Sequence, residues 1–187
     1  AFLQDQVLGS RALDARSDLG ALLRRANILV SSFREASDSL ENYNQQLLRT
    51  PSIRPVARDL SWVTSQFNPS RRHPIYHTIR EHPGIDIAAD PNTPIVAPAD
   101  GTVIDAGWQV GYGNGVRIDH GNGIVTYFAH ASQILVRQGQ RVSRNDPIAL
   151  VGSTGTSTGP HLHYEVEVDG VNVDPRQFIL PEDIVVD

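Results

Sequence analysis

The chain has 187 residues, 40% of them hydrophobic and 20% charged, which is enough for one folded domain with an appendage and argues against wholesale disorder. Its net charge of −5 argues against nucleic acid as the main partner, and the absence of Cys excludes disulfides, thiol nucleophiles and cysteine-ligated zinc. The chain has no apolar stretch of transmembrane length, no signal segment and no Met, so we expect a processed or truncated piece whose targeting segment is missing.

Residues 1–50 carry a heptad pattern that predicts one long helix. Apolar residues recur at every seventh position, and the first four are each followed four positions later by a second member of the stripe: Leu19, Ala26, Phe33, Leu40 and Leu47, then Leu23, Val30, Ser37 and Asn44. Two interpretations stay open. Either the helix packs on its own domain, or it is the end of a coiled coil that spaces the protein, mediates self-association or meets an envelope protein partner.

A proline-rich stretch follows the helix. Pro51 ends the helix, because the residue before a proline is pushed out of the helical conformation. Further prolines recur as far as residue 83, so we expect residues 51–82 to form an entry strand and a long loop. His73, Tyr76 and His77 lie in that loop, where most histidines are simply solvated.

The sequence from Gly84 onward predicts short strands. The clearest signal is a hairpin of residues 115–119 and 124–129 around Asn122-Gly123, a pair that favours tight turns. Other strands are expected at residues 93–98, 101–107 and 148–151, with a turn inside residues 136–142. Because turns recur roughly every eight to twelve residues and no helical pattern intervenes, we expect a mainly antiparallel β sandwich or partly open barrel.

A glycine-rich loop at residues 155–160 leads into a strand at residues 161–168 that we expect to carry the chemistry. Successive side chains of a strand alternate between its two faces, so His161, His163 and Glu165 point the same way. At that spacing, one imidazole can hold a metal while the other moves protons.

A second cluster, at residues 82–86, can complete a metal site. Two ligands four residues apart reach one ion only if the chain bends between them, and Gly84 permits a bend. His82, Asp86 and His163 then predict one Zn²⁺ per chain, with a fourth position left to a metal-activated water. The mixture of imidazole and carboxylate disfavours Ca²⁺ and Mg²⁺, which prefer shells made only of oxygen.

Two more histidines can supply the acid–base chemistry that amide hydrolysis needs. His161 shares a strand face with His163, and His130 ends the predicted hairpin, although an exposed strand-end histidine is the alternative for His130. Glu165 either orients a metal ligand or is a plain exposed carboxylate. His120 lies beside the hairpin turn and is assigned no role.

Three motifs taken together resemble the LytM/lysostaphin-type zinc metallopeptidases. The motifs are His82-x-Gly84-x-Asp86, Ala129-His130, and Gly152-Ser153-Thr154-Gly155-x-Ser157-Thr158-Gly159-Pro160-His161-Leu162-His163. The resemblance runs from about Pro51 to Leu180. The chain departs from the family pattern at residues 65–71, where Phe-Gly-x-Arg is usual, and at Phe128-Ala129-His130-Ala131, where Tyr-Ala-His-Leu is usual.

The resemblance implies a two-part chain, with a helical or coiled-coil segment at residues 1–50 and a LytM-type β domain at residues 51–187, whose core spans about 82–180. It implies zinc held by His82, Asp86 and His163. It also implies that His161 and His130 serve the activated water and the tetrahedral intermediate, and that Tyr76 helps to hold the oxyanion.

The substrate that the resemblance implies is the peptide cross-links of bacterial peptidoglycan. That substrate would place the protein in the bacterial cell envelope, in the periplasm or on the extracellular face, with membrane anchoring through a segment absent from this chain.

Alternatives to an active zinc endopeptidase remain. A non-catalytic module of the same fold would bind the wall and recruit or activate another hydrolase, but such modules typically lack a ligand or a catalytic histidine, and this chain keeps all five residues. A third form has competent residues and a loop at residues 68–81 lying over the groove. The last alternative is a structural coiled-coil spacer whose β domain is a passive cap. This alternative is disfavoured because it gives no role to the five metal-binding and proton-transfer residues.

Overall fold

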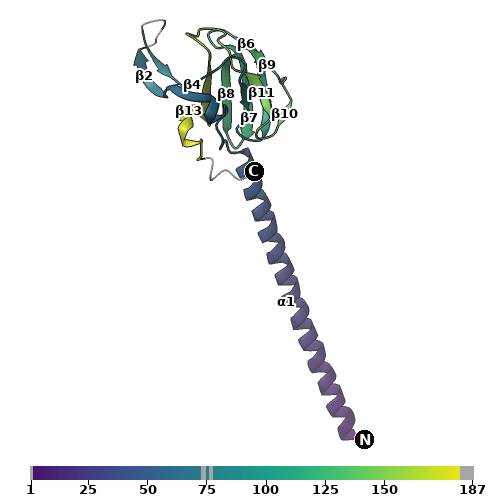
Figure 1. Ribbon diagram of the computed structural model, residues 1–187. Coiled ribbons are helices and arrows are strands. Elements are labelled where there is room, and N and C mark those ends of the chain that lie inside the picture. Colours follow the sequence, from purple (N-terminus) through teal and green to yellow (C-terminus); the bar gives the residue numbers. More distant parts are fainter. Residues whose placement is uncertain (1, 73–74, 76–77, 182–187) are drawn as a thin grey trace. The chain divides into compact units, whose positions relative to one another are not determined.

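The computed structural model describes residues 2–72, 75 and 78–181, with side chains from residue 16 onward. The chain divides into two compact units, residues 1–46 and 47–187. Helix α1 (Phe2–Arg49) makes up the first unit, and its residues 47–49 are counted with the second unit. The second unit is built of strands and two short 3-10 helices, Arg58–Leu60 and Pro175–Gln177 (Figure 1). No helix in the described part of the chain is both long enough and apolar enough to span a bilayer.

The predicted N-terminal helix is confirmed, because α1 runs unbroken through the heptads. The apolar side chains of its stripe are exposed, with Leu19 and Leu23 57% accessible and Phe33 74% accessible. What covers this stripe stays a prediction.

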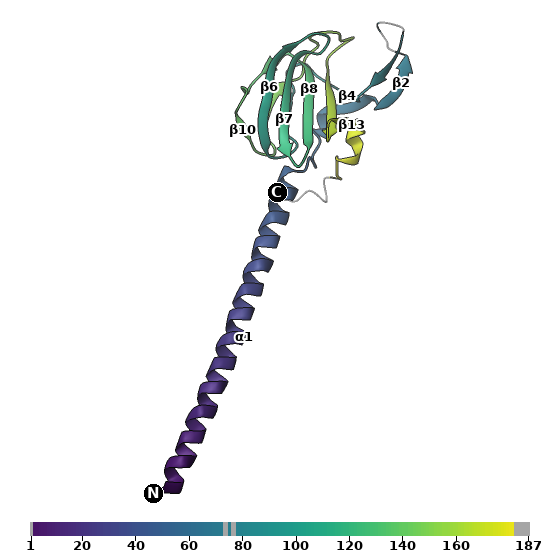
Figure 2. The ribbon, with the colours of Figure 1, turned by 180° about the vertical axis from the view of Figure 1, so that it is seen from behind.

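An antiparallel sheet of eight strands forms the body of the second unit (Figures 1 and 2). In spatial order it contains β1 (Ser61–Ser65), β4 (Gly84–Ala89), β12 (His161–Val168), β8 (Ile124–Ala131), β7 (Gly113–Gly121), β6 (Gly101–Gln109) and β10 (Arg141–Val142), and β13 (Val171–Val173) pairs with β12. A smaller sheet contains β5 (Pro94–Val96), β11 (Pro147–Leu150) and β9 (Gln133–Ile134), and a ribbon contains β2 (Asn68–Arg72) and β3 (Ile79–His82). The described strands close no barrel, since the large sheet ends at β1 and β10.

The hydrophobic core draws on both the large sheet and the small one. One buried cluster contains side chains from both sheets: Ile85 of β4, Leu162 and Tyr164 of β12, and Ile95 and Ile148 of the small sheet. The alternation predicted for β12 is therefore confirmed, because its even-numbered side chains fill the core. The odd-numbered side chains of the same strand lie on the opposite face.

The predicted hairpin is confirmed as β7 and β8, joined at Asn122 and Gly123 with φ of +52° and +76°. Positive φ at both central residues is what a type I′ turn requires. The expectation of one entry strand and a loop at residues 51–82 was wrong in part, because β1, β2 and β3 all lie there. Pro69 sits inside β2, which is tolerated because β2 pairs with β3 alone.

Candidate metal centre

The three predicted zinc ligands come together where β3 ends and β4 runs beside β12. His82 is the last residue of β3, Asp86 lies in β4, and the strands are interrupted at Pro83, so the predicted bend exists. Asp86 and His163 are direct partners in the antiparallel pairing of β4 with β12. Sheet register therefore places these two side chains next to each other on the face opposite the core.

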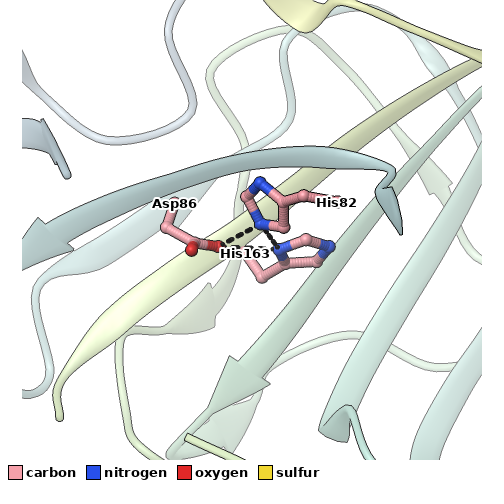
Figure 3. Close-up of side chains that lie close together, drawn as sticks. All are labelled: His82, Asp86 and His163. Atoms are coloured by element: carbon pink, nitrogen blue, oxygen red, sulfur yellow. Dashed lines mark hydrogen bonds and ion pairs between the residues drawn. The ribbon is translucent and has the colours of Figure 1, made fainter. Parts of the chain in front are cut away.

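The donor atoms of the three side chains point toward one another (Figure 3). Nε2 of His82 lies 3.0 Å from Oδ1 of Asp86 and 3.2 Å from Nδ1 of His163, and the last two atoms are 2.8 Å apart. Three atoms that share one tetrahedral zinc at about 2.0–2.1 Å lie about 3.3 Å from one another. The spacing thus fits a single small cation.

The hydrogen bonds around the cluster leave lone pairs at its centre. Nδ1 of His82 lies 2.8 Å from the carbonyl oxygen of Gln66, which can only accept, so this nitrogen carries the proton. Nε2 of His163 donates in the same way to Oε1 of Glu165 at 2.9 Å. The two nitrogens that face each other are therefore unprotonated in the neutral rings, and a carboxylate oxygen joins them. Such a donor set fits a metal cation, and zinc prefers this mixture of ligands.

The charges of the site also favour a cation. Burial acts to lower the pKa of His163, but its hydrogen bonds to Asp86 and Glu165 raise that pKa to about 9. Burial acts to raise the pKa of Asp86, but His163 and His82 hold it well below its usual range. A positive charge is therefore stabilised between these side chains, whether a proton or a metal ion supplies it.

Gly84 serves the site differently from what its place in the motif suggests. A Cβ at this position would lie 2.2 Å from the carbonyl oxygen of Tyr164, so only glycine lets β4 approach β12 this closely. The bend itself falls at Pro83, between β3 and β4. Gly84 therefore sets the separation of the strands that carry Asp86 and His163.

His161 and His130 lie beside the three-residue cluster. The ring centroid of His130 lies 4.8 Å from that of His161 and 6.0 Å from that of His163. Burial lowers the pKa of His130 to about 4, so its ring is neutral near pH 7. The backbone of His130 has a φ of +61°, a conformation that a residue with a side chain adopts at a cost. His130 is buried to 7% exposure, unlike a solvated strand-end histidine.

A groove with a volume of about 300 Å³ opens over these side chains. Its lining includes His82, Asp86, His130, His161 and His163, together with Arg71, Arg80 and Tyr112. The guanidinium of Arg71 reaches from β2 to within 3.6 Å of Oδ2 of Asp86. The groove thus contains the cluster of His82, Asp86 and His163 together with the imidazoles of His130 and His161.

The remaining predicted residues fall in different places. Glu165 is 3% exposed and bonded to His163, so it is not a solvated carboxylate. Tyr76, like the loop histidines at 73 and 77, lies outside the described residues, and its oxyanion role stays a prediction. His120 is buried away from the groove lining, between the carbonyl of Asp100 and the hydroxyl of Thr126.

Sequence reasoning missed Arg71, Tyr112 and Asn172. Arg71 belongs to a segment set apart because it departed from the family pattern. Tyr112 stands between Gly111 and Gly113, both with positive φ, and this glycine pair was the available signal that the backbone there is held in a special conformation. Asn172 carries no signal in the sequence, because its contacts follow only from the pairing of β12 with β13.

Comparison with known proteins places this site in a family. Peptidase family M23 matches residues 80–175, just over half of the chain. An uncharacterised metalloprotease of Haemophilus influenzae is 48% identical over 120 residues, which cover 64% of this chain and 25% of that protein. Peptidoglycan DD-endopeptidase ShyA of Vibrio cholerae is 35% identical over 182 residues, covering 96% of this chain and 42% of that protein.

Solved structures agree with the sequence relatives. A zinc-containing peptidase from Vibrio cholerae superimposes with a TM-score of 0.66 and 39% identity, over 72% of this chain and 42% of that one. The chain spans less than half the length of each curated relative described above. The match to residues 80–175 contains His82, Asp86, His130, His161 and His163, which line the groove among the described residues. This chain belongs to peptidase family M23.

Proposed function

We propose that this chain is a zinc-dependent endopeptidase that hydrolyses peptide cross-links of bacterial peptidoglycan. The proposal rests on one observation: the unprotonated nitrogens of His82 and His163 and a carboxylate oxygen of Asp86 lie within 3.2 Å of one another. Two more histidines line the same groove. The names of the relatives support the class of substrate, because one of them is a peptidoglycan DD-endopeptidase.

The proposed ligands are Nε2 of His82, Oδ1 of Asp86 and Nδ1 of His163. A bound zinc ion would supply Lewis acidity, polarising a carbonyl oxygen and lowering the pKa of a water. Glu165 supports these ligands by accepting a hydrogen bond from Nε2–H of His163. This bond keeps Nδ1 of His163 directed at the proposed metal position.

The proposed catalytic residues are His161 and His130. Nδ1 of each ring donates a hydrogen bond to a backbone carbonyl, so Nε2 of each neutral ring is left as an acceptor. Two such acceptors in one groove can each accept a hydrogen bond from the same attacking water. One imidazole takes the proton as the water oxygen bonds to the amide carbon. The protonated ring then donates to the tetrahedral oxygen and delivers the proton to the leaving nitrogen as the C–N bond breaks.

The division of labour along the chain is also a proposal. Residues 51–187 would act as the peptidase domain, and residues 1–50 as a helical segment that spaces the domain or associates with a second copy or an envelope partner. A peptidoglycan substrate would place the protein in the cell envelope. Tyr76 remains the proposed oxyanion residue.

Digestion of purified sacculi tests the proposal. We expect the zinc-loaded protein to release muropeptides that mass spectrometry identifies as cross-link cleavage products, and we expect the release to stop with chelator and resume with added Zn²⁺. His163→Ala, which removes one proposed ligand, should release nothing under any condition. Zinc bound without any released product would contradict the enzyme and favour the module that recruits another hydrolase or the form with residues 68–81 over the groove.

A further inference from the structure

Glu165 accepts hydrogen bonds from two residues besides His163. Burial acts to raise the pKa of this carboxylate, and hydrogen-bonding interactions with His163 and with the hydroxyl of Tyr112 lower it. Nδ2 of Asn172 donates to its Oε2 at 3.0 Å. Neither donor belongs to β4 or β12, the strands that carry Asp86 and His163, so the carboxylate is held from three directions.

The position of Tyr112 is fixed by its backbone as well as by its ring. The residue lies in the turn between β6 and β7, where its carbonyl accepts from the backbone N–H of His130 at 2.9 Å. A Cβ on the next residue, Gly113, would lie 2.4 Å from the side chain of Thr154, so the turn packs tightly against the loop that follows β11. The ring of Tyr112 then lies 5.7 Å from that of His163, between centroids.

Asn172 forms hydrogen bonds near two of the proposed ligands, His82 and His163. Its Nδ2 carries two protons, and it donates to the carbonyl oxygen of Pro83 at 3.2 Å as well as to Glu165. Pro83 follows His82 directly in the chain. A single amide on β13 therefore ties the partner of His163 to the backbone beside His82.

We propose that Tyr112 and Asn172 are positioning residues of the metal centre, which hold Glu165 so that it keeps Nδ1 of His163 directed at the ion. This inference rests on the proposed zinc site. Rotation of the His163 ring away from the centre would break its bond to Glu165, and the two extra donors prevent the carboxylate from following the ring. Residues that orient a metal ligand from behind typically change metal affinity by about 10–100-fold when they are removed.

The chain offers a matched control for Tyr112. Tyr127 packs against Tyr112 with ring centroids 5.0 Å apart, but its hydroxyl donates to Oε1 of Gln109 at 2.9 Å. Tyr112→Phe and Tyr127→Phe both delete one part-buried hydroxyl and keep the ring. Only the first deletion removes a donor to Glu165.

Zinc affinity of the purified chain, measured by competition with a chromophoric chelator, tests the inference without using enzyme activity. We expect Tyr112→Phe to raise the zinc dissociation constant by about 10-fold, and Tyr127→Phe to leave it unchanged. The visible spectrum of the Co²⁺-loaded protein should shift for the first variant alone. Thermal unfolding of both metal-free variants provides the measure of general destabilisation.

Asn172→Ala provides a second, independent variant should Tyr112→Phe fail to fold, and we expect it to weaken zinc binding as well. Equal zinc affinity in Tyr112→Phe, Asn172→Ala and the parent protein would overturn the inference, as would an equal loss in Tyr112→Phe and Tyr127→Phe. A parent protein that binds no zinc would instead contradict the proposed function on which the inference rests.

Discussion

His130 and His161 are held by the same loop. Nδ1 of His130 donates to the carbonyl of Thr154, and Nδ1 of His161 donates to the carbonyl of Gly159, each at 2.8 Å. The glycine-rich stretch between β11 and β12 thereby sets the tautomer of both rings and leaves both Nε2 atoms as acceptors.

Removal of His161 should separate zinc binding from hydrolysis. We expect His161→Ala to bind one zinc per chain and to digest sacculi about 10²–10⁴-fold more slowly, the usual cost of a missing acid or base. His120→Gln is the matched control, since His120 is buried outside the groove, and its rate should equal that of the parent. An unchanged rate in His161→Ala, measured from initial muropeptide release, would refute its assigned role.

The strained backbone of His130 allows its chemistry to be separated from its effect on stability. At a φ of +61°, His130→Gly should unfold with a free energy about 1 kcal/mol higher than His130→Ala, because glycine adopts this conformation without penalty. Both variants should lose about 10²–10⁴-fold in rate, since both lack the imidazole. Urea denaturation and sacculus digestion measure the two effects, and an Ala variant as stable as the Gly variant would argue against strain.

The close approach of β4 to β12 at Gly84 should be intolerant of a methyl group. Gly84→Ala places a Cβ 2.2 Å from the carbonyl oxygen of Tyr164. We expect the free energy of unfolding to fall by about 3 kcal/mol, the upper part of the range for overpacked sites. Zinc affinity should fall too, because Asp86 moves away from His163.

Gly107→Ala is the control for this pair of measurements. A Cβ there meets no atom within 4 Å, so its stability in urea and its zinc affinity should match the parent. A Gly84→Ala variant that behaved like Gly107→Ala would show that the strand separation at Gly84 is not tightly set.

His120 should make the fold sensitive to acid. Burial lowers the pKa of His120 in the folded chain below 6.5, the ordinary value that applies in the unfolded chain. At a pH between the folded and the unfolded pKa, the unfolded chain therefore binds a proton that the folded chain does not. The free energy of unfolding should therefore fall as the pH drops below about 6.5. His120→Gln removes this titration, and its stability should decline less between pH 7.5 and pH 5.5 in urea denaturation. Parallel declines in the two proteins would contradict this account.

The parts of the fold that local patterns determine could be predicted from the sequence. The heptads of residues 1–50 predicted α1, and Asn122-Gly123 predicted the β7–β8 turn, because each signal depends on neighbouring residues alone. The alternation of His161, His163 and Glu165 predicted which side chains of β12 share a face. Metal-ligand chemistry and the family motifs predicted that residues 82, 86 and 163 converge. The register between β4 and β12 accounts for the pairing of Asp86 with His163.

The parts that depend on contacts between distant segments could not be predicted. Strands β2 and β3 pair within a proline-rich stretch that has no alternation of apolar residues, so their sequence pattern is typical of a loop. Tyr112 and Glu165 interact although they lie far apart in the sequence, so no local pattern could indicate this contact. Gly84 was singled out as the point of a bend, but the bend falls at Pro83, and the close contact of Gly84 with Tyr164 follows from strand pairing and not from the motif.

The claim on which the account depends is that His82, Asp86 and His163 hold one zinc ion, and anomalous diffraction at the zinc absorption edge tests it most directly. Crystals of the zinc-loaded protein should show one anomalous peak per chain, about 2.0–2.2 Å from Nε2 of His82, Oδ1 of Asp86 and Nδ1 of His163. The peak should be missing in His163→Ala. No peak at these atoms, or a peak held by other side chains, would contradict the account.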